Sequence, residues 1–152
     1  MQSQKLDIVY TQAVGFNLEN ETYGIDILNV SEIIKPINIT FIPNTLDFVL
    51  GVINLRGKII PIVDLNKKFF DKFKDITPDS RIIIVSVEDN NVGFLVDRIK
   101  KIFHIDKQNI ENSPETVSES IQKYIKGVGK LDEVLVILLD ANTILKEGGY
   151  KS

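Results

Sequence analysis

The sequence predicts a mainly β fold made of two similar small barrels. Three observations predict it: the residue balance, short apolar runs between polar turns, and an internal repeat. Only two alanines occur in the 152 residues, while isoleucine, valine and threonine together supply nearly a third of them. Branched side chains favour the pleated surface of a sheet, whereas alanine is the best helix former. A chain of this length with 43% hydrophobic residues can also bury a real core.

In the first half of the chain, apolar stretches separated by polar turns predict strands. The segment Val14–Ile27 is expected to form a hairpin around the turn Glu19–Glu21. Residues 36–43 alternate in polarity and are bounded by prolines, which suits an edge strand. Two apolar strands follow in "GVINLRGKIIPIVDL" (Gly51–Leu65), and a short helix capped by Asp64 comes after them.

The second half repeats this order of elements. The segment Arg81–Ile105 predicts a hairpin with a polar turn at Glu88–Asn91, and Asn109–Gln122 is a polar loop. A last hairpin is expected in "GVGKLDEVLVILLD" (Gly127–Asp140). A terminal helix over residues 140–148 is capped by the aspartate that ends this hairpin.

The two halves align with each other. The segment "YGIDILNVSEII" (Tyr23–Ile34) matches "VGFLVDRIKKIF" (Val92–Phe103), with glycine opposite glycine and apolar positions in register. Further on, Gly51–Leu65 matches Gly127–Ala141 without gaps. The same order of matching segments in both halves indicates an ancient duplication.

The duplication predicts a single domain, 1–152, of two barrels with about five strands each. The first barrel is expected at approximately 14–70 and the second at approximately 80–140, with the helix 140–148 packing back on them and residues 1–12 flexible. The sequence leaves open an exchange of strands between the barrels. Small sheets curl to remove exposed edges, and two thin cores should pack together as one unit. A groove between the halves is a natural binding site.

The residue types argue against an enzyme. The chain has no cysteine and a single histidine, His104, so thiolate chemistry and multi-histidine metal sites are excluded. Asp64 and Asp140 could be imagined as an acid–base pair, but each precedes a predicted helix and is better explained as a cap. No phosphate-binding loop and no nucleophile elbow occur. The sequence therefore predicts no catalytic residue, no cofactor and no metal.

Charge and the amino terminus also limit the functions. A formal charge of −3 and a pI near 5.2 argue against nucleic acid as a partner, because binding it requires a concentrated basic face. The first residues lack the pattern of a signal peptide, and no apolar run reaches the length of a membrane span. A cytoplasmic protein without direct membrane insertion is expected.

Three motifs carry a family resemblance. The segments "YGIDILNVSEI" (Tyr23–Ile33), "GVINLRGKIIPIVDL" and "VGFLVDRI" (Val92–Ile99), in this order, resemble the CheW family of bacterial chemotaxis adaptors. The resemblance implies two intertwined, five-stranded SH3-like barrels. It also implies an adaptor for signal transduction, without catalysis, that couples the cytoplasmic tips of chemoreceptors to the regulatory domain of the histidine kinase CheA. Such a protein is recruited to membrane receptor arrays through its partners.

Arg56 is the strongest candidate for a contact with a partner protein. Arginine is scarce here, and Arg56 precedes Gly57 in a tight turn that presents a planar donor fork suited to a carboxylate or to carbonyls. An ordinary exposed turn residue is the alternative. The resemblance places receptor contacts at Arg56, Glu32 and Val30, with the last two on the same side of an extended segment. Ile82 and Ile102 fall near the matching groove of the second half, although core burial explains these two equally well.

The segment between Pro36 and Pro43 is the candidate for a kinase contact. Its alternation breaks at its end, where two apolar residues are adjacent, so one of them should face outward. The predicted kinase-binding residues are Ile39, Phe41 and Ile42, and the alternative is an edge that the other barrel covers. A second function stays open, because small β-barrels also bind small ligands or nucleic acid. Such a barrel would need an open polar pocket or exposed aromatic residues in a basic groove.

Overall fold

The structure, a computed structural model, describes residues 10–43, 46–112, 119–131 and 133–147. In chain order the strands are β1 (Tyr10–Leu18), β2 (Glu21–Asp26), β3 (Val30–Ile34), β4 (Thr40–Phe41), β5 (Val49–Leu55), β6 (Lys58–Asp64), β7 (Arg81–Val87), β8 (Asn90–Val96), β9 (Arg98–Asp106), β10 (Ile110–Glu111), β11 (Ile125–Leu131) and β12 (Val134–Leu139). The helices are α1 (Leu65–Phe70), α2 (Glu119–Gln122) and α3 (Ala141–Glu147). The prediction of a mainly β fold is confirmed.

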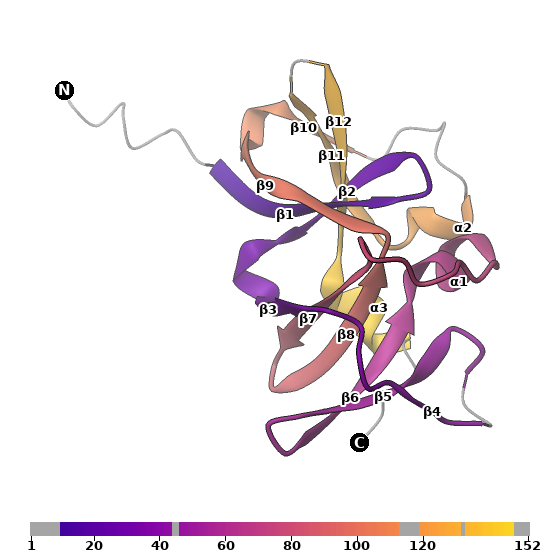
Figure 1. The fold of residues 1–152 in the computed structure, drawn as a ribbon. Coiled ribbons are helices and arrows are strands. Elements are labelled where there is room, and N and C mark those ends of the chain that lie inside the picture. Colours follow the sequence, from indigo (N-terminus) through magenta and orange to yellow (C-terminus); the bar gives the residue numbers. More distant parts are fainter. Residues whose placement is uncertain (1–9, 44–45, 113–118, 132, 148–152) are drawn as a thin grey trace.

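The strands form two six-stranded sheets, one in the upper and one in the lower part of Figure 1. Sheet A has the order β10-β11-β12-β2-β1-β9, and sheet B has the order β3-β7-β8-β6-β5-β4. Each sheet therefore has one strand more than predicted. The additional strands are β10 and β4, which pair over only two residues at one edge of each sheet.

Each sheet combines strands from both halves of the sequence repeat. The β1–β2 hairpin lies in sheet A with β9–β12, and the β7–β8 hairpin lies in sheet B with β3–β6. The predicted division at 14–70 and 80–140 therefore does not follow the sheets, and the exchange of strands that the sequence left open takes place. Strand β1 begins at Tyr10, so residues 10–12 belong to a sheet and not to a flexible segment, while residues 1–9 lie outside the described residues.

The exchanged hairpins attach to their sheets in the same register. Strands β12 and β2 run parallel with Leu138 opposite Gly24, and strands β6 and β8 run parallel with Ile62 opposite Gly93. These four residues occupy equivalent positions in the sequence alignment. The repeat in the sequence thus has a matching repeat in the backbone pairing.

The two edges of each sheet are close in space. Strands β9 and β10 lie at opposite edges of sheet A but are joined by only the three-residue turn Lys107–Asn109, and β3 and β4 are joined in the same way by residues 35–39. Because three residues span at most about 10 Å and five at most about 18 Å, the opposite edges of each sheet must approach each other. Both sheets therefore curl into barrel-like shapes.

A central core joins the two sheets, and a smaller core lies within each of them. The central cluster contains Phe16 and Ile25 of sheet A, Val85 and Phe94 of sheet B, and Phe69 of α1. The core of sheet B consists of Ile53, Ile60, Ile62, Ile82, Ile84 and Leu95, and the core of sheet A consists of Ala13, Phe103, Ile105, Val136 and Leu138. Because one face of each sheet contributes to the central cluster, the halves form one packed unit.

The predicted helix caps are present. The Asp64 carboxylate accepts hydrogen bonds from the backbone N–H groups of Asn66 (3.0 Å) and Lys67 (3.3 Å), and Asp140 accepts one from Thr143 (3.3 Å). Burial raises the pKa of Asp64 above its ordinary value. Each aspartate begins its own helix, as predicted. No helix in the described parts of the chain is long and apolar enough to cross a membrane.

Asp97 fixes one of the two points where the chain crosses between the sheets. It follows β8 in sheet B and precedes β9 in sheet A. Its carboxylate accepts hydrogen bonds from the backbone N–H of Glu19 (2.9 Å), from the Asn66 amide (2.7 Å) and from the Lys74 ammonium (2.8 Å). The equivalent residue at the other crossing is Leu28, which is 88% exposed. One crossing is thus tied by hydrogen bonds and the other presents an apolar side chain to solvent.

Candidate functional site

The turn between β5 and β6 holds Arg56 in a fixed position. Leu55 pairs with Lys58, which leaves Arg56 and Gly57 as a two-residue hairpin loop. Both loop residues have positive φ, 52° for Arg56 and 85° for Gly57, as the favoured two-residue hairpin turns with two left-handed positions require. The Asn54 side-chain oxygen accepts a hydrogen bond from the Gly57 N–H at 3.0 Å. A non-glycine residue at positive φ is unfavourable by about 1 kcal/mol, so this turn is specified and not incidental.

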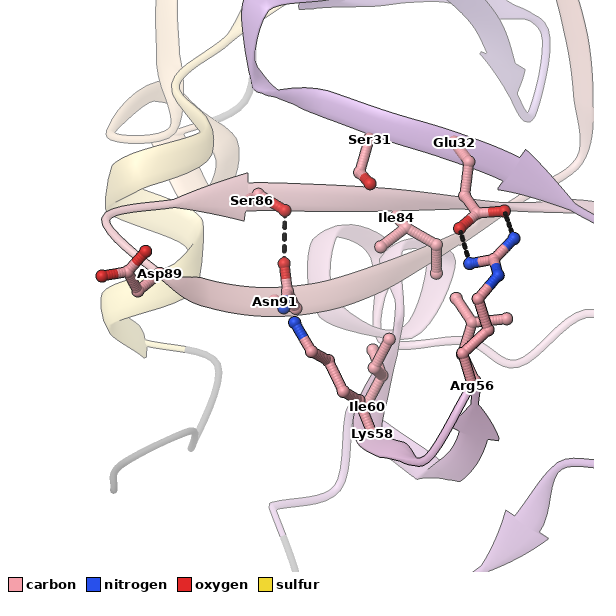
Figure 2. Close-up of a pocket in the computed structure, with 10 residues that line it drawn as sticks. Ser31, Glu32, Arg56, Lys58, Ile60, Ile84, Ser86, Asp89 and Asn91 are labelled. Atoms are coloured by element: carbon pink, nitrogen blue, oxygen red, sulfur yellow. Dashed lines mark hydrogen bonds and ion pairs between the residues drawn. The ribbon is translucent and has the colours of Figure 1, made fainter.

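Arg56 and Glu32 form a bidentate ion pair (Figure 2). The distances are 2.6 Å from Nη1 to Oε2 and 3.0 Å from Nη2 to Oε1. The Arg56 side chain is 71% exposed and that of Glu32 is 27% exposed. The hydrogen bond from Arg56 lowers the pKa of the Glu32 carboxyl, and the same bond raises the pKa of Arg56. Because Glu32 lies on edge strand β3 and Arg56 on the β5–β6 turn, the pair spans the open end of curled sheet B.

The pair forms one side of a groove of about 570 Å³, which we call groove B. Ile60 and Ile84, both buried, contribute apolar surface to the groove. On the other side of the groove from the ion pair, Ser86 is hydrogen-bonded to Asn91. Figure 2 shows Lys58 extending toward Asn91 while Arg56 extends toward Glu32. The remaining lining residues are Ser31, Leu55 and Asp89. A groove with this lining can receive a side chain or a short segment of a partner.

Sheet A has a groove at the equivalent place, which we call groove A. It has a volume of about 990 Å³ and is lined by Lys101, Ile102, Phe103, His104, Leu131, Glu133 and Val134. In the sequence alignment Lys101 replaces Glu32 and Val134 replaces Lys58. Asp132, the counterpart of Arg56, lies outside the described residues. The two grooves thus share a backbone position and differ in charge.

The predicted receptor residues lie in different environments. Glu32 and Arg56 are brought together, a pairing that sequence reasoning did not anticipate. Val30 is half-buried against the central core, and a bulge between Val30 and Glu32 separates the two along β3, so the expectation of a shared side is wrong. Ile82 is completely buried in the core of sheet B, which excludes it as a surface contact. Ile102 is 45% exposed, but in groove A.

The predicted kinase residues lie at the edge of sheet B. Phe41 is 65% exposed and Ile42 is 39% exposed, whereas Ile39 is half-buried against the core of sheet B. Ile37, which the alternation placed with the half-buried residues, is 62% exposed. Asn38 has a φ of 59°, which interrupts the extended backbone and so breaks the period of two. Only the last part of the predicted edge strand, β4, pairs with its neighbour.

Sequence reasoning missed several residues of groove B. Lys58, Ser31, Ser86 and Asn91 line it but lie on four different strands or turns, so no sequence motif brings them together. Of these four residues, only Lys58 could have been identified from the sequence, because it directly follows the Arg56–Gly57 turn. Within the described residues no group of three or more acidic or histidine side chains could hold a metal ion.

Comparison with known proteins assigns the family. The model of the CheW-like domain matches residues 12–148. The chemotaxis protein CheW of Helicobacter pylori is 39% identical over 136 residues, which cover 90% of this chain and 82% of that protein. The chemotaxis protein CheW of Thermotoga maritima is 35% identical over 136 residues, which cover 90% of this chain and 88% of that protein.

A solved structure agrees with this assignment. The crystal structure of the scaffolding protein TtCheW from Thermoanaerobacter tengcongensis has a TM-score of 0.84 and 36% sequence identity with this chain, and the match covers 95% of this chain and 98% of that one. The family prediction is confirmed, and the alternative of a barrel for a small ligand or nucleic acid is not favoured. Proteins of this family are scaffolds and adaptors, generally without catalysis. The chain belongs to the CheW-like domain family.

Proposed function

We propose that this chemotaxis scaffold protein couples chemoreceptors to the histidine kinase CheA and that groove B is its receptor surface. The observation that carries the receptor assignment is the Glu32–Arg56 pair on a strained, well-braced turn. Strained backbone positions persist where the surrounding structure fixes them, and they concentrate at binding sites. A rigid, exposed guanidinium loses little freedom when a partner arrives, which favours binding.

The receptor surface in this proposal consists of Glu32 and Arg56 in groove B, with two additional contacts: Val30, which is half-buried beyond the bulge in β3, and Ile102 in groove A. Ile82 has no exposed surface and is left out. The Arg56 guanidinium has five N–H groups, of which two are engaged by Glu32, so others remain for carbonyls or carboxylates of a receptor helix.

The kinase surface in this proposal is the edge of sheet B. Phe41 and Ile42 present apolar area there, and Ile39 is half-buried against the core of sheet B. Apolar residues exposed beside a short edge strand suit a partner of similar fold. Because β4 and the β5–β6 turn are different parts of sheet B, one rigid body would hold receptor tip and kinase regulatory domain at a fixed separation.

Coupling in this scheme is geometric and needs no bond to be made or broken in the scaffold. The protein would reside in the cytoplasm and reach membrane receptor arrays through its two partners, without inserting into the bilayer and without a cofactor or metal. A change in the receptor tip would reach the kinase through the position of the scaffold.

The test is a capture experiment with a receptor cytoplasmic fragment and the CheA regulatory domain, each alone and both together. We expect the wild type to retain both at once, Arg56→Glu to lose the receptor fragment only, and Phe41→Asp to lose the kinase domain only. Phe73→Asp is the matched control for the second variant, because Phe73 is also exposed, at 53%. If the two partners exclude each other, the proposal of separate surfaces is wrong.

A further inference from the structure

We propose that Lys58 is the residue in groove B that recognises the receptor by forming an ion pair with one of its carboxylates. A receptor helix would present this carboxylate next to an apolar side chain. This inference rests on the proposed function, because it assumes that a receptor docks at groove B. It assigns the recognition of charge to Lys58 and gives Arg56 a mainly positioning role.

The charges that line groove B differ in whether they are paired. Arg56 and Glu32 satisfy each other in a bidentate pair, so a partner carboxylate can take the favoured edge of the Arg56 guanidinium only by displacing Glu32. Lys58, in contrast, has no side-chain partner among the residues that the structure describes. No ion pair joins it to Asp89, the other unpaired charge of this groove, within that part of the chain.

Lys58 is placed by the β5–β6 hairpin. Its backbone is paired with Leu55 directly after the braced Arg56–Gly57 turn, so the start of its side chain is fixed by the hairpin. Figure 2 shows its ammonium reaching toward Asn91 on β8, on the far side of the groove from the Glu32–Arg56 pair. A cation held at one side of an open groove attracts an acidic group more effectively than a free surface lysine.

The groove that Lys58 lines contains both apolar and polar groups. Ile60 and Ile84 supply apolar surface in the same groove, while Ser31 and Asn91 supply polar groups. An apolar surface next to a single unpaired cation is complementary to an apolar side chain with a carboxylate close to it. On a partner helix, residues three or four positions apart lie on one face and meet this requirement.

Groove A offers an internal comparison. Val134, 40% exposed, stands at the position equivalent to Lys58, and Lys101 stands at the position equivalent to Glu32. The arrangement of an ion pair at one side and an unpaired lysine at the other therefore exists only in groove B among the described residues. Because Val134 occupies the equivalent position in the β11–β12 hairpin, this hairpin fold does not require a lysine at position 58, and the Lys58 side chain is available for binding.

The experiment measures the affinity of a chemoreceptor cytoplasmic fragment for wild type, Lys58→Gln, Lys58→Glu and Lys126→Glu at low and at moderate salt. Lys126 is an exposed strand lysine of sheet A and serves as the matched control. We expect Lys58→Gln to weaken binding several-fold and Lys58→Glu to weaken it about tenfold, with a smaller salt dependence in both, because a charge-assisted contact is lost. The control should stay within about twofold, and all variants should unfold at the wild-type temperature.

The partner residue is found by charge reversal. Each acidic residue at the tip of the receptor fragment is changed to lysine, and one of these changes should restore binding to Lys58→Glu. Wild-type affinity in Lys58→Glu, or an equal loss in Lys126→Glu, would overturn this inference while leaving the proposed function intact. A wild-type protein that fails to bind the fragment would instead overturn the proposed function and this inference with it.

Discussion

Sheets A and B are built on one backbone plan and differ in a few side chains. The parallel attachments place Leu138 opposite Gly24 in sheet A and Ile62 opposite Gly93 in sheet B. Even the irregularities recur, because the bulge in the β5–β6 pairing and that in the β11–β12 pairing occur at equivalent positions. The shared plan follows from apolar patterning and glycines, which both halves of the sequence retain.

The differences concentrate at two places. In groove B, Glu32 is paired with Arg56, whereas the position of Glu32 in groove A holds Lys101. At the crossings between the sheets, Asp97 accepts three hydrogen bonds, whereas its counterpart Leu28 is exposed. Folding therefore constrains the buried, repeated positions, and the two sheets differ at polar and exposed residues, which form a candidate binding surface in groove B and a structural contact at Asp97.

The largest expected effect is on the free energy of unfolding when alanine replaces either of two equivalent glycines, Gly51 in sheet B and Gly127 in sheet A. A Cβ added at Gly51 would lie 2.2 Å from the backbone oxygen of Thr40 in β4, whereas at Gly127 the nearest atom is a side-chain methyl of Ile110 at 2.6 Å. Because a methyl group can move and a paired strand cannot, Gly51→Ala should lower the free energy of unfolding by about 3 kcal/mol and Gly127→Ala by about 1 kcal/mol. Urea unfolding measures both. Equal losses would show that β4 is not held as described.

A second effect concerns Tyr23, whose counterpart in sheet B is Val92. Tyr23 is 2% exposed, and burial, with a smaller contribution from nearby Glu21, raises its pKa to about 12. An unfolded chain releases this proton near pH 10 and the folded chain retains it, so stability present below pH 10 should fall as the pH rises to 12, by about 2.5 kcal/mol. Tyr23→Phe should remove this part of the pH dependence. An unchanged alkaline slope in that variant would contradict the assignment.

The next effect tests the asymmetry of the crossings. Asp97→Ala removes the acceptor for Glu19, Asn66 and Lys74 and leaves the buried Asn66 amide without its partner, which should lower the unfolding free energy by about 2 kcal/mol. Leu28→Ala should change it by less than about 0.5 kcal/mol, because the leucine is almost fully exposed. Thermal or denaturant unfolding of the two variants measures both changes. An equal loss of unfolding free energy in Leu28→Ala and Asp97→Ala would show that the two crossings do not differ as described.

The smallest effect concerns the titration of Glu32. Its pKa is lowered from the ordinary value of 4.5 by the hydrogen bond from Arg56, so its contribution to stability is present above that value and is lost as the pH falls through the lowered pKa. Because Arg56 is exposed and Glu32 is partly so, the change in overall stability should be slight. Carboxyl NMR should find the Glu32 midpoint below 4.5 in the wild type and closer to 4.5 in Arg56→Gln. Identical midpoints would show that the ion pair does not persist in solution.

Much of the fold could be predicted because its signals are local. The hairpins, the aspartate caps and the matching glycines depend on short stretches of sequence, and Arg56 was identified by its glycine turn. The residue pattern only left open the exchange of the β1–β2 and β7–β8 hairpins, because the exchange depends on parallel pairing between segments far apart in the chain. The family resemblance implied intertwined barrels.

The side-chain environment of the site was harder to predict for the same reason. The pair of Glu32 and Arg56 forms only because sheet B curls until β3 approaches the β5–β6 turn. Ile82 was expected near the groove of the second half or in the core, but its strand β7 is an interior strand of sheet B and its side chain is completely buried there. A single positive φ at Asn38 exposed Ile37, which alternation alone would bury.

The most direct test of the account is the affinity of a chemoreceptor cytoplasmic fragment for Arg56→Glu, with Arg98→Glu as the control. Arg98 is also an exposed arginine in an ion pair, with Asp79 at 3.6 Å, but it does not line groove B. We predict that Arg56→Glu weakens receptor binding at least about tenfold, because it repels Glu32 and opens the side of the groove, while Arg98→Glu binds like the wild type. Wild-type affinity in a folded Arg56→Glu protein would contradict the claim that groove B recognises the receptor.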